Sequence, residues 1–235
     1  MIPLFYGNGG IWLLLLLVGG GGALVGYRMK TKFKTYGEIP LVAGLSGKEV
    51  AEKMLKDNGI FDVQVTSVEG FLSDHYNPLT KTVNLSPEVY AGTSIASAAV
   101  AAHECGHALQ HARSYSMLML RSKLVPAVRF SAGLVTWILL IGVLTLRIFP
   151  QVLLAGIVLF TVTTIFSFIT LPVEFDASSR ALVWLSSSRL TTGEEQVKIK
   201  DALWWAAMTY LVAAISSLIT LIYYIMIFLG GRNRN

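Results

Sequence analysis

"LWWAAMTYLVAAISSLITLIYYIMIFL", Leu203 to Leu229, contains no charged side chain. A helix that crosses a bilayer needs roughly 20 apolar residues at about 1.5 Å rise each, and this segment is long enough. Trp204 and Trp205 stand at one end, as expected for side chains at a membrane–water interface. The segment therefore predicts a transmembrane helix, which makes the chain a membrane protein.

The composition of the whole chain supports this interpretation. Of 235 residues, 54% are hydrophobic and only 14% are charged, and the mean hydropathy is +0.60. A soluble domain is nearer one quarter charged. The net charge of +5 could favour nucleic acid, but the cations cluster beside apolar segments. Membrane topology explains them better, so no nucleic-acid partner is expected. The single cysteine excludes an internal disulfide.

Three further segments predict spans, at Ile11–Tyr27, Phe130–Leu146 and Val152–Leu171. The first is followed, not preceded, by cations, which favours a retained anchor over a cleaved signal peptide. The link Arg147–Pro150 is short, so the second and third spans form a hairpin. None of the four spans has a charge in its middle, which argues against a metal transporter because such proteins use ionisable groups inside the membrane.

The basic residues predict the orientation. All of the 19 Lys and Arg residues except Arg147, Arg232 and Arg234 lie within residues 28–129 and 172–202. The positive-inside rule places these two regions in the cytoplasm and both termini outside. The predicted organisation is an N-terminal anchor (1–27), a cytosolic region (28–129), a transmembrane hairpin (130–171), a cytosolic segment (172–202) and a C-terminal transmembrane helix with its tail (203–235).

The larger cytosolic region has mixed secondary structure. Leu45–Gly59 reads as an amphipathic helix in which Ser46 and Glu49 form a capping box. Phe61–Val68 and Lys81–Ser86 read as strands with a polar loop between them. A short helix then follows Ser86, and Thr93 or Ser94 caps a longer one. The expected fold class is thus an α+β membrane protein, mostly helical, with about four transmembrane helices and a short sheet.

The longer helix carries "AAVAAHECGHALQHA", Ala98 to Ala112. His103 and His107 are four residues apart and therefore share one helix face, where both imidazoles can bind one metal ion. Together with Glu104 they form the pattern H-E-x-x-H. Zinc held in this way activates water, and the glutamate can accept its proton as a peptide carbonyl is attacked. The pattern predicts a zinc metallopeptidase.

Two other kinds of site compete with this one. His111 extends the histidine row, which is compatible with a histidine-rich membrane oxygenase, but such a site needs several more ligands and only His75 remains of the four histidines. A non-catalytic scaffold with a structural zinc, or with none, is the second alternative. A closed structural site usually uses several cysteines, and Cys105 is the only one, more simply read as a small core residue.

A catalytic zinc needs a third protein ligand, which must return to the same membrane face. "LPVEFDASSRA", Leu171 to Ala181, does so, because the third span runs from outside to inside. Glu174 is the candidate and Asp176 competes with it. Pro172 is expected to end the span helix, so that a new helix starts near Glu174.

Other polar residues are candidates for the catalytic machinery. His75 and Tyr76 lie on the predicted loop, where either could donate a hydrogen bond to the oxyanion of the tetrahedral intermediate. Arg180 could do the same or hold a substrate carboxylate. The strand Lys81–Ser86 is a candidate edge for pairing with an extended substrate.

HECGH, PVEFDASSRA and SDHYNPLTKTVNLS together resemble the YugP-type zinc-dependent membrane metallopeptidases of bacteria, over nearly the whole chain. More distantly the chain is similar to the membrane gluzincins related to the heat-shock protease HtpX and the CAAX prenyl protease. The resemblance implies a gluzincin-like unit facing the cytoplasm from a multi-pass protein of the bacterial plasma membrane. It also implies zinc as the cofactor and Glu174 as the third ligand.

The same resemblance implies proteolytic quality control, with peptides or misfolded membrane proteins at the bilayer as substrates. Such relatives usually place an acid four residues after the glutamate ligand to orient a zinc histidine, and this chain has Ser178 there. Asp176 or Asp74 is then a candidate for that role. An exposed protease site must be restrained, so a membrane scaffold that cages it, or a homo-oligomer, is the expected partner.

Overall fold

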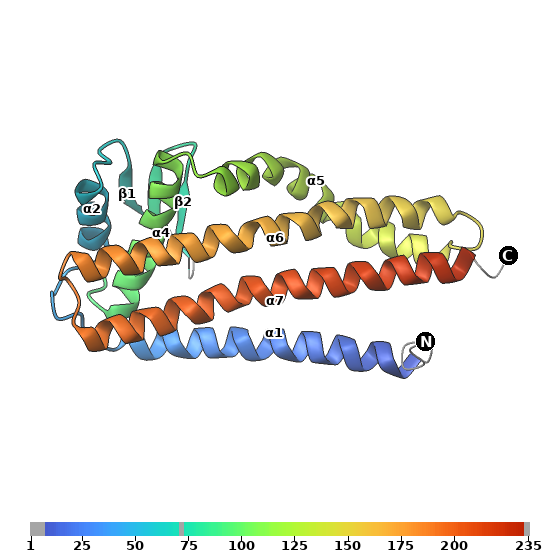
Figure 1. Cartoon of the computed structure of the whole chain (residues 1–235), viewed down its shortest axis with the longest axis horizontal. Coiled ribbons are helices and arrows are strands. Elements are labelled where there is room, and N and C mark those ends of the chain that lie inside the picture. Colours follow the sequence, from blue (N-terminus) through green and yellow to red (C-terminus); the bar gives the residue numbers. More distant parts are fainter. Residues whose placement is uncertain (1–7, 71–72, 233–235) are drawn as a thin grey trace. The chain divides into compact units, whose positions relative to one another are not determined.

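A computed structural model describes residues 8–70 and 73–232 (Figure 1). The chain separates into two compact units, and each is described by itself. One consists of Met1–Gly22, Leu120–Leu171 and Tyr210–Asn235, and the other of Ala23–Met119 and Pro172–Thr209. Four long helices contribute residues to both units: α1 (Asn8–Gly37), α5 (Ser116–Leu144), α6 (Pro150–Ser187) and α7 (Gly193–Arg232).

The first unit contains helices and no strand in its described part. It holds most of α5 (Ser116–Leu144), which connects to α6 through a short turn at residues 145–149 and so forms the predicted hairpin. Glycine allows the two helices of this hairpin to touch, because a Cβ at Gly142 would lie 2.5 Å from Cα of Leu153. The small apolar core beside this contact consists of Val135, Leu139, Leu153, Ile157 and Leu221.

Three helices of the described chain are long and apolar enough to cross a membrane: Ser116–Leu144, Pro150–Ser187 and Gly193–Gly230. Four spans were predicted. The segment 11–27 is helical within α1 but is not one of the three, and its side chains at 11–15 and 17 lie outside the described residues. The fourth span therefore stays a prediction.

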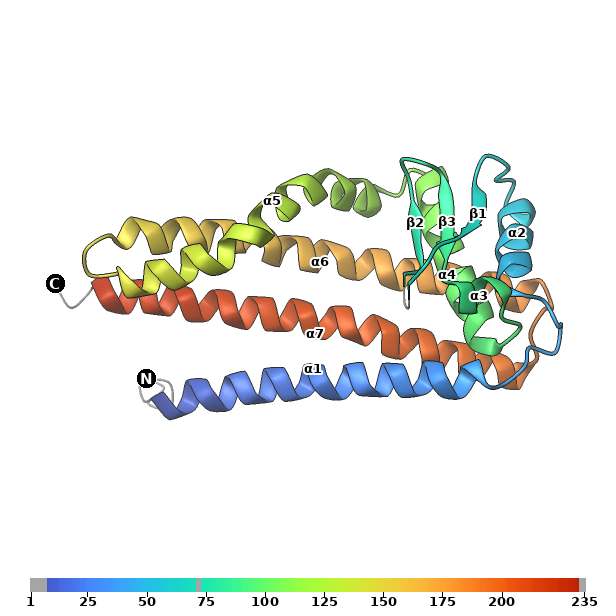
Figure 2. The same cartoon turned by 180° about the vertical axis from the view of Figure 1, so that it is seen from behind.

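The second unit combines helices with a small sheet (Figure 2). The elements that lie wholly within it are α2 (Gly47–Asp57), β1 (Gln64–Ser67), β2 (His75–Asn77), β3 (Thr82–Leu85), α3 (Pro87–Ala91) and α4 (Ile95–Ala112). The capping box is confirmed, since the Ser46 amide donates to Glu49 Oε2 at 2.8 Å and the Glu49 amide donates to Ser46 Oγ at 3.3 Å. Gly59 follows α2 with φ +73°, which favours glycine.

The sheet corrects two predictions. Its strand order is β1-β3-β2, with β1 parallel and β2 antiparallel to β3. The strand expected at Lys81–Ser86 is therefore the central strand and not an edge. The segment expected to be a loop contains β2, which forms the edge. A three-residue strand of polar side chains has no apolar alternation, so only its pairing with β3 and its contact with α4 define it.

Helix α6 corrects a third prediction, because it continues through Pro172 to Ser187. Val173, Ala177 and Ala181 are buried along its second half. Packing against α4 holds this part of the helix in place. Gly106 on α4 allows the closest approach, where an added Cβ would lie 2.5 Å from the carbonyl oxygen of Ala177. The packing outweighs the hydrogen bond that proline removes from the helix.

Candidate metal centre

Helix α4 is the central element of the second unit. Ser94 caps its first turn, with its Oγ accepting from the Ser97 amide at 3.1 Å, so one of the two predicted caps is confirmed. Alanine is the commonest residue at its buried positions, with six of 14, and these small side chains let α2 and the second half of α6 pack closely against it. Close packing on both sides fixes the direction in which the histidine face points.

Three side chains of the second unit converge on one point. Nε2 of His103 lies 3.3 Å from Oε2 of Glu174, and Nε2 of His107 lies 3.6 Å from the same oxygen. The potential ligand atoms all lie within 4.8 Å of one another. Glu174 is only 2% exposed, so the group is closed on the side of α6. The predicted pair of histidines and the predicted third ligand are thus brought together.

This geometry fits zinc. Two ligands of a tetrahedral zinc, each bound at about 2.1 Å, lie about 3.4 Å apart. The two nitrogen-to-oxygen distances of 3.3 and 3.6 Å match that separation. Two imidazoles and one carboxylate are also a common ligand set of catalytic zinc, in which the fourth position holds water or substrate.

The opposite nitrogen of each imidazole is held from behind. Nδ1 of His107 donates to Oε1 of Gln110 at 3.0 Å, and Nδ1 of His103 lies 3.1 Å from Oγ of Ser178. A hydrogen bond at Nδ1 directs Nε2 and its lone pair toward the centre. Ser178 therefore occupies both the sequence position and the spatial position in which the relatives are expected to place an acid.

Asp176 contacts a partner of a metal-ligand candidate, Gln110, and not the imidazoles themselves. Gln110 Nε2 donates to Oδ2 of Asp176 at 2.8 Å and to the carbonyl oxygen of Val173 at 2.7 Å. Asp176 thus supports Gln110, which in turn supports His107, and it is not one of the three converging groups. The other predicted candidate, Asp74, accepts from the amide and Oγ of Ser86 and does not contact either imidazole through these bonds.

Glu104 lies on the same helix face and is held by the edge strand. The backbone amide of Tyr76 donates to Oε2 of Glu104 at 2.9 Å, which fixes a carboxylate that is only 8% exposed. A hydrogen bond from a backbone amide to a carboxylate is generally stronger than one between two neutral groups. The strand that the sequence did not reveal therefore positions the predicted general base.

The side chains of His75 and Tyr76 point to opposite faces of β2, because successive residues of a strand alternate. The Tyr76 hydroxyl lies 2.8 Å from Nδ1 of His111 on α4. His75 is exposed, and its ring contacts the Ser73 carbonyl oxygen and the Asn84 side chain. His111 is thus a partner of Tyr76 outside the converging group, and His75 lies away from that group.

Arg180 is bound to its own helix. Its Nε donates to Oδ2 of Asp176 at 2.6 Å, and its guanidinium lies 5.9 Å from the ring centre of Tyr115. This is the ion pair along one helix face expected for residues four apart. Its contacts in this structure are therefore with Asp176 and Tyr115.

Burial and neighbouring charges change the pKa values of two side chains on α4, His107 and Cys105. Burial by itself would lower the pKa of His107, but its hydrogen bond to Glu174 and the charges of Glu174 and Glu104 outweigh that effect and raise the pKa. A bound metal would take the place of that proton, since only neutral imidazole is a ligand. Burial raises the pKa of the Cys105 thiol well above its usual range, which agrees with the predicted role as a core residue.

Gln110 and Ser178 are the positioning residues that the sequence analysis did not identify. One signal was available for Gln110, which stands three residues after His107 and so on a neighbouring part of the same helix face. The hydrogen bond from the Tyr76 amide to Glu104 could not be predicted from the sequence. Almost every residue has a backbone amide, and only the fold determines which one reaches Glu104.

The chain belongs to the family described as "Putative neutral zinc metallopeptidase", which matches residues 11–229. It is 42% identical over 209 residues to the "Putative membrane protease YugP" of Bacillus subtilis (strain 168), a match that covers 89% of this chain and 92% of that protein. The resemblance inferred from the three motifs is thereby confirmed. Zinc is the metal of the family, and the group formed by His103, His107 and Glu174 could bind it. No solved structure matches the chain significantly.

Proposed function

We propose that this protein is a zinc-dependent membrane endopeptidase that hydrolyses peptide bonds of membrane-associated or misfolded proteins. The observation that carries the proposal is the convergence of two imidazole nitrogens on one buried carboxylate oxygen at zinc-like separations. His103, His107 and Glu174 hold the metal. When bound, zinc supplies Lewis-acid polarisation of the peptide carbonyl and lowers the pKa of water.

Glu104 serves as the general base. It follows His103 directly, so its carboxylate lies beside the metal ligands without being one of the three. The Tyr76 amide occupies one side of Oε2 and so orients the carboxylate before substrate arrives. Glu104 takes a proton from the attacking water and delivers it to the leaving amine, as a general base that becomes a general acid does.

His75 and Arg180 have no assigned part in this proposal. His75 projects from the face of β2 opposite to Tyr76, and Arg180 is engaged by Asp176. Either would have to leave these partners to reach an oxyanion. The YugP relative is described as a membrane protease, which supports a peptide substrate at a lipid bilayer. A caging scaffold or a homo-oligomer stays a prediction.

We further propose that residues 28–129 and 172–202 face the cytoplasm. The distribution of Lys and Arg supports this orientation, since only Arg147, Arg232 and Arg234 lie outside these ranges. The arrangement brings Glu174 to the same side of the membrane as the H-E-x-x-H helix, which their convergence in one compact unit requires.

Zinc analysis and cleavage of casein or of a membrane-protein peptide, in wild type and in Glu104→Gln, test the function. Glutamine keeps the shape and the bond from Tyr76 but cannot accept the proton. We expect turnover to fall by about 10² to 10⁴ while bound zinc is retained. A non-catalytic scaffold would have no activity to lose, and equal turnover in both proteins would refute the mechanism.

The ligand set has its own test. Glu174→Ala removes a carboxylate oxygen that both Nε2 atoms approach, so zinc content should fall strongly. Asp176→Asn keeps an acceptor for Gln110 and should reduce zinc content only slightly. Full zinc occupancy in Glu174→Ala would shift the third ligand to Asp176.

A further inference from the structure

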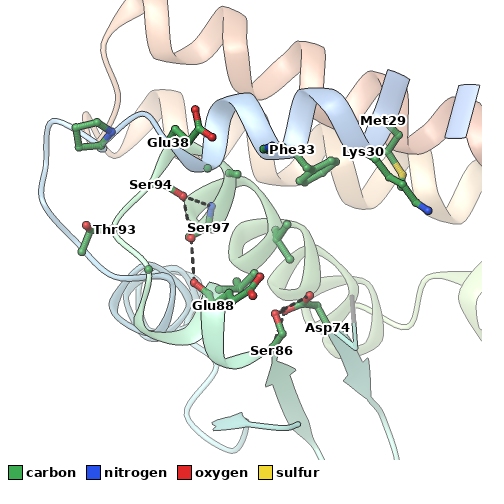
Figure 3. Close-up of a pocket in the computed structure, with 17 residues that line it drawn as sticks. Met29, Lys30, Phe33, Glu38, Asp74, Ser86, Glu88, Thr93, Ser94 and Ser97 are labelled. Atoms are coloured by element: carbon green, nitrogen blue, oxygen red, sulfur yellow. Dashed lines mark hydrogen bonds between the residues drawn. The ribbon is translucent and has the colours of Figure 1, made fainter. Parts of the chain in front are cut away.

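The second unit contains a pocket of about 720 Å³ that the proposed chemistry does not use (Figure 3). It is bounded by the end of α1, by the segment before β2, by α3 and by the first turns of α4. Its volume lies within the range of about 300–1,000 Å³ found for ligand-binding pockets. The pocket is therefore large enough to hold more than one side chain of a bound molecule.

The pocket continues the face of α4 that carries the metal ligands. Ala96 and Val100 line it, and His103 and His107 follow at intervals of three and four residues, the spacing of one helix face. At 1.5 Å rise per residue, Val100 lies about 4.5 Å and Ala96 about 10.5 Å from His103 along the axis. The pocket thus begins one helical turn from the metal centre.

The edge strand β2 also connects the pocket with the metal centre. Asp74 lines the pocket, and it stands two residues before Tyr76, whose amide is bound to Glu104. Two extended residues span about 7 Å, so β2 connects the general base to the pocket over a distance comparable with that along α4. Two independent elements therefore place the pocket beside the metal centre and on the same side of it.

The lining chemistry favours a peptide. Met29 and Phe33 extend from α1 (Figure 3). Together with Val89 and Val100 they supply half-buried apolar side chains. Around them stand basic and acidic side chains, among them Lys34, Glu88 and Asp74, and hydroxyl groups such as that of Ser86. An apolar patch enclosed by charged and hydroxyl groups suits an apolar side chain carried on a polar main chain.

We propose that this pocket binds a bulky apolar side chain of the peptide substrate, and that Phe33 and Val100 determine the preference for it. The inference rests on the proposed peptidase function. Since an extended peptide advances about 3.3 Å per residue, a distance of 4.5 to 10.5 Å corresponds to a residue one to three positions from the scissile bond. In every cleaved peptide the residue that occupies the pocket should lie on the same side of the scissile bond.

Cleavage of a peptide library, mapped by mass spectrometry, provides the test. Wild type should select bulky apolar residues at one position within three residues of the cleaved bond. Val100→Trp fills the pocket, so KM for such peptides should rise about tenfold or more, the selected residue should become Gly or Ala, and zinc content should not change. Phe33→Ala enlarges the pocket and should broaden the preference.

Matched controls exist for both substitutions. Val42 is 76% exposed and Phe61 is 79% exposed, and neither lines the pocket. Val42→Trp and Phe61→Ala should keep the wild-type preference. Binding is measured separately, as fluorescence anisotropy of the selected peptide with the Glu104→Gln protein, in which Val100→Trp should weaken binding about tenfold or more.

The possible results separate the pocket from the function. Wild-type cleavage with an unchanged preference in Val100→Trp and Phe33→Ala overturns the pocket and leaves the peptidase function intact. Peptide binding to Glu104→Gln that depends on Val100, without cleavage by wild type, supports the pocket and overturns the function. If wild type cleaves no peptide and the Glu104→Gln protein binds none, both the pocket and the peptidase function are overturned.

Discussion

Gln110 holds His107 in one tautomer. Gln110 Nε2 points at the carbonyl oxygen of Val173, 2.7 Å away, and a carbonyl can only accept, so this end of the amide must be the NH₂ group. The oxygen at the other end then faces Nδ1 of His107 at 3.0 Å, and Nδ1 must carry the proton. The lone pair of His107 is thereby placed on Nε2, the atom directed at Glu174.

Gln110→Leu should therefore weaken zinc binding. The substitution removes the acceptor for Nδ1 and leaves the Val173 carbonyl without its donor. Partners of metal ligands are typically worth 10- to 100-fold in metal affinity, and we expect a loss in that range. Competition with a chromogenic chelator measures it. Gln64→Leu, on an exposed strand position, is the control and should bind zinc as wild type does. Unchanged affinity in Gln110→Leu would show that Gln110 has only a packing role.

Ser178 supports the other histidine, so its replacement should act through His103. Ser178→Ala removes the oxygen 3.1 Å from Nδ1 and should lower zinc affinity about tenfold. Ser178→Asp offers a carboxylate at the same place and should restore or exceed wild-type affinity, because a carboxylate is the stronger acceptor. Ser179→Ala alters the exposed neighbour and should have no effect. If Ser178→Asp binds zinc no better than Ser178→Ala, Ser178 does not orient His103.

The parts of this site that follow from local rules were predictable. His103 and His107 share a face because any two helical residues four apart do so. Glu104 stands three residues before His107 and therefore neighbours the same face. The predicted order of spans returned the segment of Glu174 and Asp176 to the side of the H-E-x-x-H helix, and the resemblance to the family then favoured Glu174 over Asp176. Ser46 and Glu49 specify the start of α2 within four residues of chain, and the structure contains that capping box.

The parts that depend on tertiary contacts were not predictable from a pattern. The strand His75–Asn77 has no apolar alternation, and it is defined by pairing with β3 and by the bond from Tyr76 to Glu104. Pro172 normally predicts a helix end, but the packing of Val173 and Ala177 keeps α6 continuous. Both errors arose where long-range contacts override a local preference.

Gly106 determines how closely α6 can approach α4, so its substitution should disturb the metal centre from a distance. In Gly106→Ala the new Cβ would lie 2.5 Å from the carbonyl oxygen of Ala177, which is a backbone atom and cannot rotate away. We expect a loss of about 1–3 kcal/mol in stability and weaker zinc binding, because Glu174 is carried on the same helix.

Thermal unfolding with and without zinc measures this effect. Gly26→Ala is the matched control, since a Cβ at Gly26 on α1 would meet nothing within 4 Å. Alanine there should be neutral or slightly stabilising, as is usual in a helix. Wild-type zinc affinity in a correctly folded Gly106→Ala protein would show that the position of Glu174 does not depend on this contact.

The proposed orientation can be tested by cysteine labelling in a Cys105→Ala background. Lys34, Arg147 and Lys200 are exposed positions, so a cysteine at each is accessible to a reagent. In intact cells an impermeant maleimide should label Arg147→Cys, and it should label Lys34→Cys and Lys200→Cys only after the cells are opened. External labelling at position 200 with internal labelling at position 34 would place Glu174 and the H-E-x-x-H helix on opposite sides of the membrane. Zinc binding by His103, His107 and Glu174 would then be excluded.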